Sequence, residues 1–179
     1  MIDQNTLSRF KFLADLPVGI LADMAAVSRL LSFEPSKVIF RSGDEADTLY
    51  GVIEGEVELS LEALEKNLDA QVEFEEAVHL RVMEKASQIS VDAARPGNVF
   101  GWSALTGKPR RTVTATCSLP TKVAAIPAKN LIAMCEGNNT LGYALMKRLV
   151  DIISKRLDNR NKRLIEIWVE TYGVSKVSS

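Results

Sequence analysis

The stretch of this sequence best suited to chemistry runs from residue 95 to residue 105 and reads RPGNVFGWSAL. Gly101 leads into a segment that resembles a helix start, where free backbone N–H groups favour a phosphate or a carboxylate. Arg110 and Arg111 follow, and guanidinium groups match the oxygens of the same anions. Trp102 stands beside the glycine, although an indole supplies one hydrogen-bond donor and no acceptor. These residues indicate either a small-anion site or a site filled by the ring.

The other reactive residue types argue against catalysis and against a metal site. His79 is the only histidine, and it lies at an alternating position of EEAVHLRV, where we expect a surface strand residue. Glu75 and Glu76 are adjacent, so a strand would point them to opposite faces. Cys117 and Cys135 form no CxxC pair, so zinc and iron–sulfur clusters lack a ligand set. We predict no catalytic residue and no metal, and we expect Cys117 to be a small core residue.

Composition favours an ordinary globular chain. It has 179 residues, of which 46% are apolar and 25% are charged, enough for one domain and an appended element. The net charge of -1 gives no global field that would attract nucleic acid or an anionic membrane. No apolar run reaches the length of a membrane span, and the first residues lack a secretory signal core. We therefore expect a cytoplasmic protein without a membrane segment.

Short strands are predicted to follow helices at the start of the chain. Residues 7–31 carry one apolar stripe in two helical pieces, with Pro17 opening the second piece. Residues 38–40 read as a strand, Gly43 supplies a turn, and residues 54–56 read as a hairpin turn between alternating apolar positions. Strands at this spacing predict an antiparallel barrel or sandwich.

Residues 62–88 leave two alternatives open, because they combine charged helix formers with apolar positions that alternate with period two. We favour an extended hairpin with a solvent-exposed face over a helix. Further strands are predicted around residues 113–117 and 123–127, where alternating positions and β-branched residues occur.

The rest of the chain is predicted to be helical, with a short helix ended by Gly137 and a long one from about Leu141 to Tyr172, capped by Thr140. At about 1.5 Å per residue the long helix spans roughly 48 Å, more than a small barrel needs. Its first half carries an apolar stripe that we expect to lie against the barrel, formed by Leu145, Leu149 and Ile152.

A second set on the long helix, here called the heptad stripe, alternates spacings of three and four as coiled-coil seams do. It consists of Tyr143, Met146, Val150, Ile153, Leu157, Arg160, Leu164 and Ile167. We predict a homodimer through this stripe, with Arg160 as a register-setting residue. The alternative is a helix that folds the stripe onto its own domain. Lysines and arginines beside the stripe are balanced by acidic residues elsewhere and read as a solvated face.

This order of elements resembles the cyclic-nucleotide-binding domain of the catabolite-activator type. The matching stretches are FLADLPVGILADMA, VIFRSGDEADTLYGVIEGEVELS with turn glycines Gly43, Gly51 and Gly55, PGNVFGWSAL and RRTVTATCSLPTKVAAI. The resemblance implies an α+β fold, namely a double-stranded β-helix (jelly-roll) barrel with N-terminal helices and a long C-terminal dimerisation helix. It implies a domain at residues 1–138, a helix at 139–173 and a disordered tail at 174–179.

The resemblance also implies a phosphate-binding cassette, which in nucleotide-binding members reads Phe-Gly-Glu and ends in an arginine followed by a small residue. The chain keeps Phe100 and Gly101 but has Trp102 in place of the glutamate, so the ribose contact cannot be made in the family's way. The cassette is also about two residues shorter, which leaves the choice between Arg110 and Arg111 open. The implied ligand-binding residues are Gly101, Trp102, Ser103, Ala104, Leu105, Arg110, Arg111 and Thr112.

The sequence thus predicts a non-enzymatic sensor that takes a small anion or a cyclic nucleotide and signals to a downstream protein partner through a dimer helix. The alternative is a degenerate, ligand-free dimerisation or scaffolding module. The family's transcription regulators carry a helix-turn-helix domain after the dimer helix. Here seven residues follow Tyr172, so we expect no direct DNA binding.

Overall fold

The computed structural model describes residues 2–74, 77–107 and 110–173, with side chains described outside residues 64–86. The predicted tail at 174–179 and the side chain of His79 therefore lie outside the described part. The helices are α1 (Gln4–Ser8), α2 (Val18–Val27), the 3-10 helix η1 (Trp102–Leu105), α3 (Ala128–Gly137) and α4 (Asn139–Tyr172). The strands are β1 (Arg29–Phe33), β2 (Val38–Phe40), β3 (Thr48–Glu54), β4 (Val57–Phe74), β5 (Ala77–Ala94), β6 (Val99–Phe100), β7 (Thr114–Cys117) and β8 (Thr121–Pro127).

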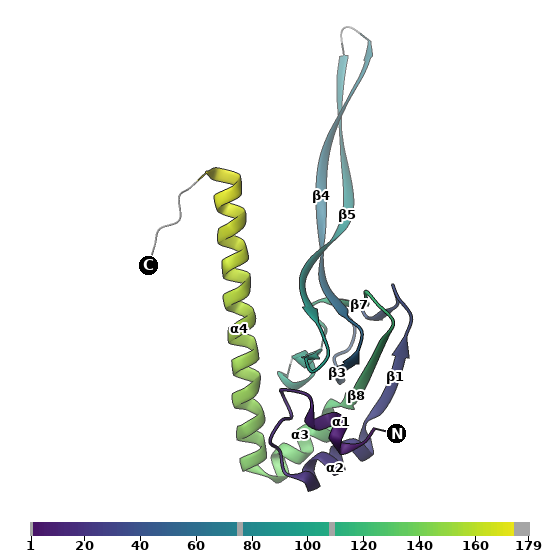
Figure 1. Cartoon of the computed structure of the whole chain (residues 1–179). Coiled ribbons are helices and arrows are strands. Elements are labelled where there is room, and N and C mark those ends of the chain that lie inside the picture. The colour runs from purple at the N-terminus through teal and green to yellow at the C-terminus, as the bar shows by residue number, and fades with distance from the viewer. Residues whose placement is uncertain (1, 75–76, 108–109, 174–179) are drawn as a thin grey trace.

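The strands form two four-stranded antiparallel sheets, in the orders β1-β8-β3-β6 and β2-β7-β4-β5. The sheets face each other as the predicted jelly roll, with helices at one end (Figure 1). In the described ranges no strand of one sheet pairs with a strand of the other, so the barrel is not closed by hydrogen bonds. The predicted fold class is confirmed in its sheets, its N-terminal helices and its long C-terminal helix.

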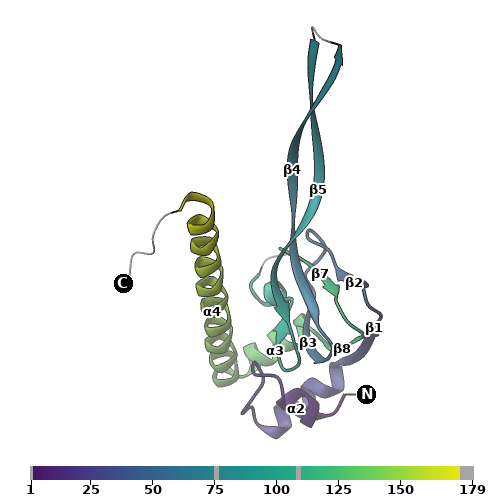
Figure 2. The ribbon, with the colours of Figure 1, turned by 45° about the horizontal axis from the view of Figure 1, so that its top comes forward.

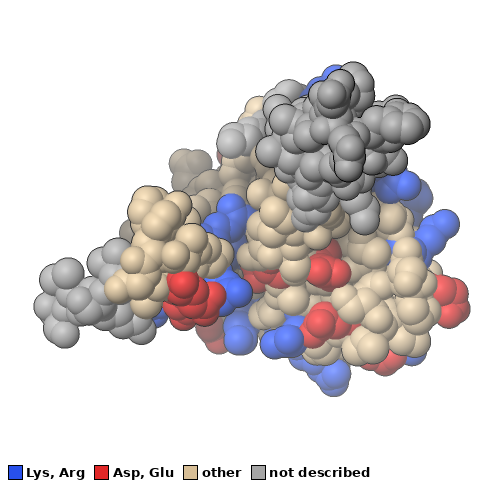
Figure 3. All heavy atoms as spheres, turned by 90° about the horizontal axis from the view of Figure 1, so that it is seen from above, with Lys and Arg blue, Asp and Glu red and all other residues tan. Residues whose placement is uncertain are grey.

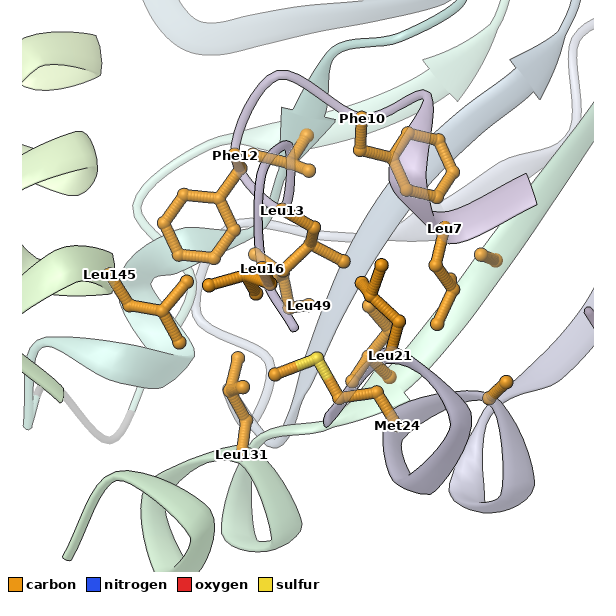
Figure 4. Packing of buried hydrophobic residues seen from close by; sticks show 14 of the residues in the cluster. Leu7, Phe10, Phe12, Leu13, Leu16, Leu21, Met24, Leu49, Leu131 and Leu145 are labelled. Carbon is orange, nitrogen blue, oxygen red and sulfur yellow. The ribbon is translucent and has the colours of Figure 1, made fainter. Parts of the chain in front are cut away.

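Two apolar clusters hold the domain together. One fills the space between the sheets and includes Phe40, Val52, Phe100 and Cys117, so the expectation that Cys117 is a core residue is confirmed. The second joins the N-terminal segment to α3 and α4 (Figure 4). There Leu131 of α3 and Leu145 of α4 point toward the same group of leucine, methionine and phenylalanine side chains. This second cluster fixes the lower half of α4 against the barrel.

Residues 62–74 and 77–88 belong to a two-stranded ribbon, which confirms the favoured hairpin. β4 and β5 pair antiparallel from Val57↔Ala94 to Phe74↔Ala77. Only the base of β4 also pairs with β7, from Val57 to Ser60. The ribbon and the upper half of α4 project from the barrel in the same direction, as Figures 1 and 2 show from two angles.

Tertiary pairing overrides the predicted helix at residues 29–31. These residues lie in β1 and pair with Val123–Ala125 of β8, and α1 is only five residues long. Pro17 does precede α2, as predicted. The turn at residues 54–56 is not a hairpin turn, because β3 pairs with β6 and β8 whereas β4 lies in the other sheet.

Two single-residue expectations were also wrong. Asn138 rather than Thr140 caps α4, because its side-chain oxygen accepts a hydrogen bond from the Leu141 N–H at 3.1 Å. Gly51 is not a turn glycine but lies inside β3. A Cβ atom at Gly51 would lie 2.6 Å from the Phe10 ring, so this glycine makes room for the N-terminal segment.

Candidate functional site

Gly101 precedes η1 and adopts the left-handed conformation, with φ 75° and ψ 22°. That conformation favours glycine over any residue with a Cβ. Space imposes the same choice, because a Cβ atom would lie 2.8 Å from Nη1 of Arg111 and 3.2 Å from the Thr48 carbonyl oxygen. The glycine therefore allows β6 to turn into η1 against a guanidinium group.

Arg111 is the buried arginine of the predicted pair, with a side chain that is 1% exposed. Nη1 donates to the Gly101 carbonyl and Nη2 to the Thr48 carbonyl, each at 2.8 Å. The guanidinium carbon lies 4.3 Å from the centre of the Phe40 ring. Burial lowers the pKa of Arg111, although Tyr50 and Asp47 act in the opposite direction. Nε is buried and has no hydrogen-bond partner in the described part of the chain.

Arg110 is exposed and lies outside this arrangement. Its Nη1 donates to the Gly43 carbonyl at 2.8 Å, and its backbone forms an isolated antiparallel bridge with Glu45. The structure thus brings Arg111, rather than Arg110, next to Gly101.

Trp102 links the 101–105 segment to the long helix. The guanidinium carbon of Arg156, on α4, lies 5.8 Å from the centre of the Trp102 ring. Arg156 also pairs through Nε with Asp92 of β5 at 2.9 Å and donates to the Val99 carbonyl. Burial lowers the pKa of Arg156 and the charge of Arg160 lowers it further, whereas Asp92 raises it. This contact joins the ring, the barrel and α4 at one point.

A cavity of about 230 Å³, here called the α4 cavity, lies between the barrel and α4. Its lining residues are Phe40, Leu59, Leu61, Gly101, Trp102, Ser103, Thr112, Val113, Ile153, Arg156, Leu157 and Arg160. The described walls are largely apolar, and their polar side-chain groups are two hydroxyls, the Trp102 indole N–H and two guanidinium groups, of which that of Arg156 is paired with Asp92. No carboxylate is among them. Such a lining suits an anion with an apolar body.

Six of the eight predicted site residues divide into two groups. Gly101, Trp102, Ser103 and Thr112 line the α4 cavity, whereas Ala104 and Arg111 are buried outside its lining.

The N–H group of Ala104 donates to the Gly101 carbonyl at 3.2 Å, so this amide is already occupied. Leu105 lines a separate apolar cavity with α3.

Sequence reasoning missed the wall that α4 contributes to the cavity. Ile153, Leu157 and Arg160 were assigned only to the dimer seam, and Arg156 only to a solvated face. The sequence did contain part of the evidence for this wall, because the four α4 residues that line the cavity recur at helical spacing on one side of the helix. Seen from the end toward which α4 and the ribbon project, basic side chains gather between the helix and the barrel (Figure 3).

Other chemistries find little support in the described residues. No group of three or more histidine, cysteine, aspartate or glutamate side chains there could hold a metal ion. Among the described helices, none combines the length and apolar character that crossing a membrane requires.

Residues 30–138 match a family model described as the cyclic nucleotide-binding domain. Among solved structures, a candidate cyclic nucleotide-binding protein from Geobacter metallireducens GS-15 is 29% identical, with a TM-score of 0.65. The match covers 88% of this chain and 99% of that protein.

The sensor domain of the transcriptional regulator DNR from Pseudomonas aeruginosa is 19% identical, with a TM-score of 0.60 over 87% of this chain and 91% of that one. The regulatory domain of Toxoplasma gondii PKA, crystallised with cAMP, is also 19% identical, with a TM-score of 0.61 over 85% of this chain and 48% of that one. No curated protein matches this chain.

Proposed function

Because the chain belongs to the cyclic nucleotide-binding domain family, we propose that it is a non-enzymatic regulatory protein that senses a small anion in the α4 cavity. One observation carries this proposal. Its described lining brings two guanidinium groups and two hydroxyls together at the meeting point of the barrel and α4, with no carboxylate among the described lining residues, and Asp92 pairs with only one of the guanidinium groups, that of Arg156. A ligand there would touch both the 101–105 segment and the long helix, and could therefore change how the helix is presented to a partner protein.

The residues present fit a small anion better than a cyclic nucleotide. Trp102 offers no acceptor for a ribose hydroxyl. Arg111, one of the two arginines that the family resemblance left open as the phosphate ligand, donates instead to the Gly101 and Thr48 carbonyls. The cavity of about 230 Å³ is also below the roughly 300–1,000 Å³ of pockets for drug-sized ligands. We propose a carboxylate or phosphate compound with a small apolar body.

The proposed assembly is a homodimer through the heptad stripe. Most members of the stripe are exposed in the single chain, and Val150, Leu157 and Leu164 are 60%, 57% and 55% exposed. The upper half of α4 lines a cavity with Ile89–Asp92 of β5 through side chains that include Leu164 and Ile167, and its end extends beyond the barrel (Figure 1). A second copy supplies an identical stripe, which a parallel two-helix seam requires. A downstream protein in the cytoplasm would then read the state of the dimer.

A second candidate, the ligand-free scaffold, is favoured by the hydrogen bonds of Arg111. A guanidinium group that donates to two backbone carbonyls acts as a structural support and needs no ligand. In this alternative the protein would serve as a dimerisation module.

Thermal unfolding with a ligand panel separates the two candidates. The panel contains cyclic AMP, cyclic GMP, AMP, inorganic phosphate and small carboxylates. A ligand at 100 times its Kd adds about 2.7 kcal/mol of stability, which raises the melting temperature measurably. Ser103→Ala should reduce the shift, whereas Arg110→Ala, outside the cavity, should retain it. A melting temperature that no member of the panel raises would favour the ligand-free scaffold.

A further inference from the structure

The ribbon of β4 and β5 continues far beyond the barrel. In the part of the chain that the structure describes, a third strand joins it only at its base, where Val57–Ser60 of β4 pair with β7. Beyond that base the ribbon stands clear of the barrel and reaches past the end of α4 (Figures 1 and 2). A two-stranded ribbon that nothing else supports is at best marginally stable in water. This length of ribbon therefore needs a surface that covers one of its faces.

The pairing of the two strands separates apolar from polar positions. Between Ser60 and Val72 of β4 the register has no shift, so paired residues share a face and successive pairs alternate between the two faces. One face, here called the apolar face of the ribbon, carries four apolar pairs. These pairs are Leu64↔Ala86, Leu68↔Val82, Ala70↔Leu80 and Val72↔Val78.

The opposite face is polar at the same levels. There the register pairs Glu65 with Lys85 and Asp69 with Arg81, each an acid across from a base. A ribbon surrounded by water needs polar residues on both faces, whereas one apolar and one polar face are typical of a sheet that is covered on one side. The apolar face therefore marks the side on which a partner lies.

One charged pair on the apolar face, Lys66↔Glu84, identifies what that partner is. A two-fold axis along the ribbon places β4 of one copy opposite β5 of a second copy, with equal levels facing each other. Lys66 of one copy then lies opposite Glu84 of the other, and the reverse contact forms on the other side of the axis. The charged pair is thus complementary to itself in this orientation.

The apolar pairs fit the same arrangement. Leu64 lies opposite Ala86 of the second copy, and Ala70 lies opposite Leu80, so large residues meet small ones as they do in packed layers. A two-fold axis across the ribbon would instead place the charged pair opposite its own copy, with like charges facing, or opposite an apolar pair. Both of these alternatives are unfavourable.

We infer that the apolar face of the ribbon is a contact between two copies of this chain, with both ribbons pointing the same way. The inference deepens the proposed homodimer and rests on it. Parallel α4 helices also require a two-fold axis along their length, and α4 projects in the same direction as the ribbon (Figure 1). The ribbon adds a second contact, away from the heptad stripe, to the same dimer.

Charge reversal tests this contact, with the dimer Kd of the full chain measured by sedimentation equilibrium at low salt. Lys66→Glu makes both positions of the charged pair acidic, and Glu84→Lys makes both basic. Each variant alone should dimerise at least about tenfold more weakly than the wild type, because like charges then face each other. An equal mixture of the two should recover the wild-type Kd, because each acidic pair meets a basic one. Neither variant restores the pairing within its own chain, so the recovery reports a contact between chains.

Glu65→Lys and Lys85→Glu are the matched controls, because they break an acid–base pair on the opposite face. Both should keep the wild-type Kd, and mixing them should change nothing. Wild-type Kd values for Lys66→Glu and Glu84→Lys, a mixture that recovers nothing, or controls that weaken the dimer equally would overturn the inference and leave the proposed α4 seam intact. A wild type that stays monomeric would overturn the proposed dimer as well. Circular dichroism confirms that each variant is folded.

Discussion

At the scale of single residues, Gly101 and Arg111 depend on each other. The guanidinium group donates to the Gly101 carbonyl and occupies the space that a side chain at Gly101 would need. The same group reaches Thr48 of β3, and it packs on Phe40 of β2. Since β2 and β3 belong to different sheets, one buried side chain holds both sheets at the level of the candidate site.

Replacing Arg111 by methionine should therefore destabilise the domain. Methionine has a similar length but no charge, so the variant loses two hydrogen bonds from a charged donor and the ion pair of Nη2 with Asp47 at 3.6 Å. We expect a loss of about 2 kcal/mol in the free energy of unfolding, measured with urea. Arg110→Met is the matched control and should cost under about 0.5 kcal/mol, because Arg110 is exposed. Equal losses in the two variants would contradict a structural role for Arg111.

Gly101→Ala tests the other half of this contact. Gly101 and Gly107 both have positive φ, of 75° and 69°, so alanine costs about 1–2 kcal/mol of backbone strain at either position. A Cβ atom at Gly107 meets nothing within 4 Å, whereas at Gly101 it meets Arg111 and Thr48. We expect Gly101→Ala to lose at least about 1 kcal/mol more than Gly107→Ala in urea unfolding. Equal losses of stability in Gly101→Ala and Gly107→Ala would contradict this expectation, because they would show that Arg111 and Thr48 move away from the new Cβ atom at little cost.

Trp102 should make the protein a poor receptor for cyclic AMP. A ribose hydroxyl buried without an acceptor costs about 1–3 kcal/mol, which is roughly ten- to a hundredfold in affinity. We expect calorimetry to show weak binding or none for the wild type and a gain for Trp102→Glu. Sub-micromolar binding of cyclic AMP by the wild type would refute this reasoning.

At the scale of elements, α4 serves two purposes along its 34 residues. Its lower half is anchored by Leu141, Leu145 and Leu149, which are buried against the N-terminal segment and α3. Its upper half extends beyond the barrel beside the ribbon of β4 and β5 (Figure 2). The sequence separates the two purposes by face, because the heptad stripe runs beside the buried leucines and continues past them.

Val150→Asp should convert the proposed dimer into monomers without unfolding the domain. Val150 belongs to the heptad stripe, is 60% exposed and lines no described cavity, so a carboxylate there disturbs only an external seam. We expect this variant to sediment as a monomer at tens of micromolar protein, a concentration at which we expect the wild type to sediment as a dimer. Lys162→Asp is the control on another face of α4 and should remain dimeric. A wild-type protein that is monomeric at that concentration would exclude the seam.

At the scale of the whole molecule, opposite charges are interleaved. The chain carries 22 lysines and arginines against 23 aspartates and glutamates. Basic side chains gather between α4 and the barrel, but acidic ones lie among and around them in the same view (Figure 3). Two ion pairs are examples of this interleaving. In Arg156–Asp92 and in Lys122–Glu54 the side-chain nitrogen lies 2.9 Å from a carboxylate oxygen. On the face shown in Figure 3, the described basic side chains form no extended stripe that would follow a phosphate backbone.

We therefore predict no sequence-specific DNA binding by this chain. Contacts from the basic residues of α4 alone would depend on counterion release and would weaken steeply with salt. Gel-shift experiments at low and at physiological salt should show, at most, a salt-sensitive and sequence-independent shift. A salt-resistant shift that depends on the DNA sequence would contradict the prediction.

Local patterns in the sequence predicted most of the elements. Alternation at residues 113–117 predicted a strand, because one face of that strand is buried and the other is less so, and alternation within residues 62–88 predicted the pairing of β4 with β5. Gly43 and Gly55 have φ of 89° and 86°, as residues in tight turns do. The apolar stripe of Leu145 and Leu149 predicted the buried face of α4, because helical spacing places these residues on one side.

Tertiary structure decided what local patterns leave open. Sheet membership of β3 and β4 depends on hydrogen bonds to distant strands, so an alternating pattern around residue 55 cannot tell a hairpin from a crossing between sheets. Arg110 and Arg111 are adjacent and chemically identical, and only the burial of this segment against Gly101 distinguishes them. The wall that α4 adds to the cavity arises where a helix packs near a sheet more than 50 residues away in sequence. The sequence by itself therefore determined most of the elements and the residue types around Gly101, while packing between distant segments decided which residues meet in the candidate site.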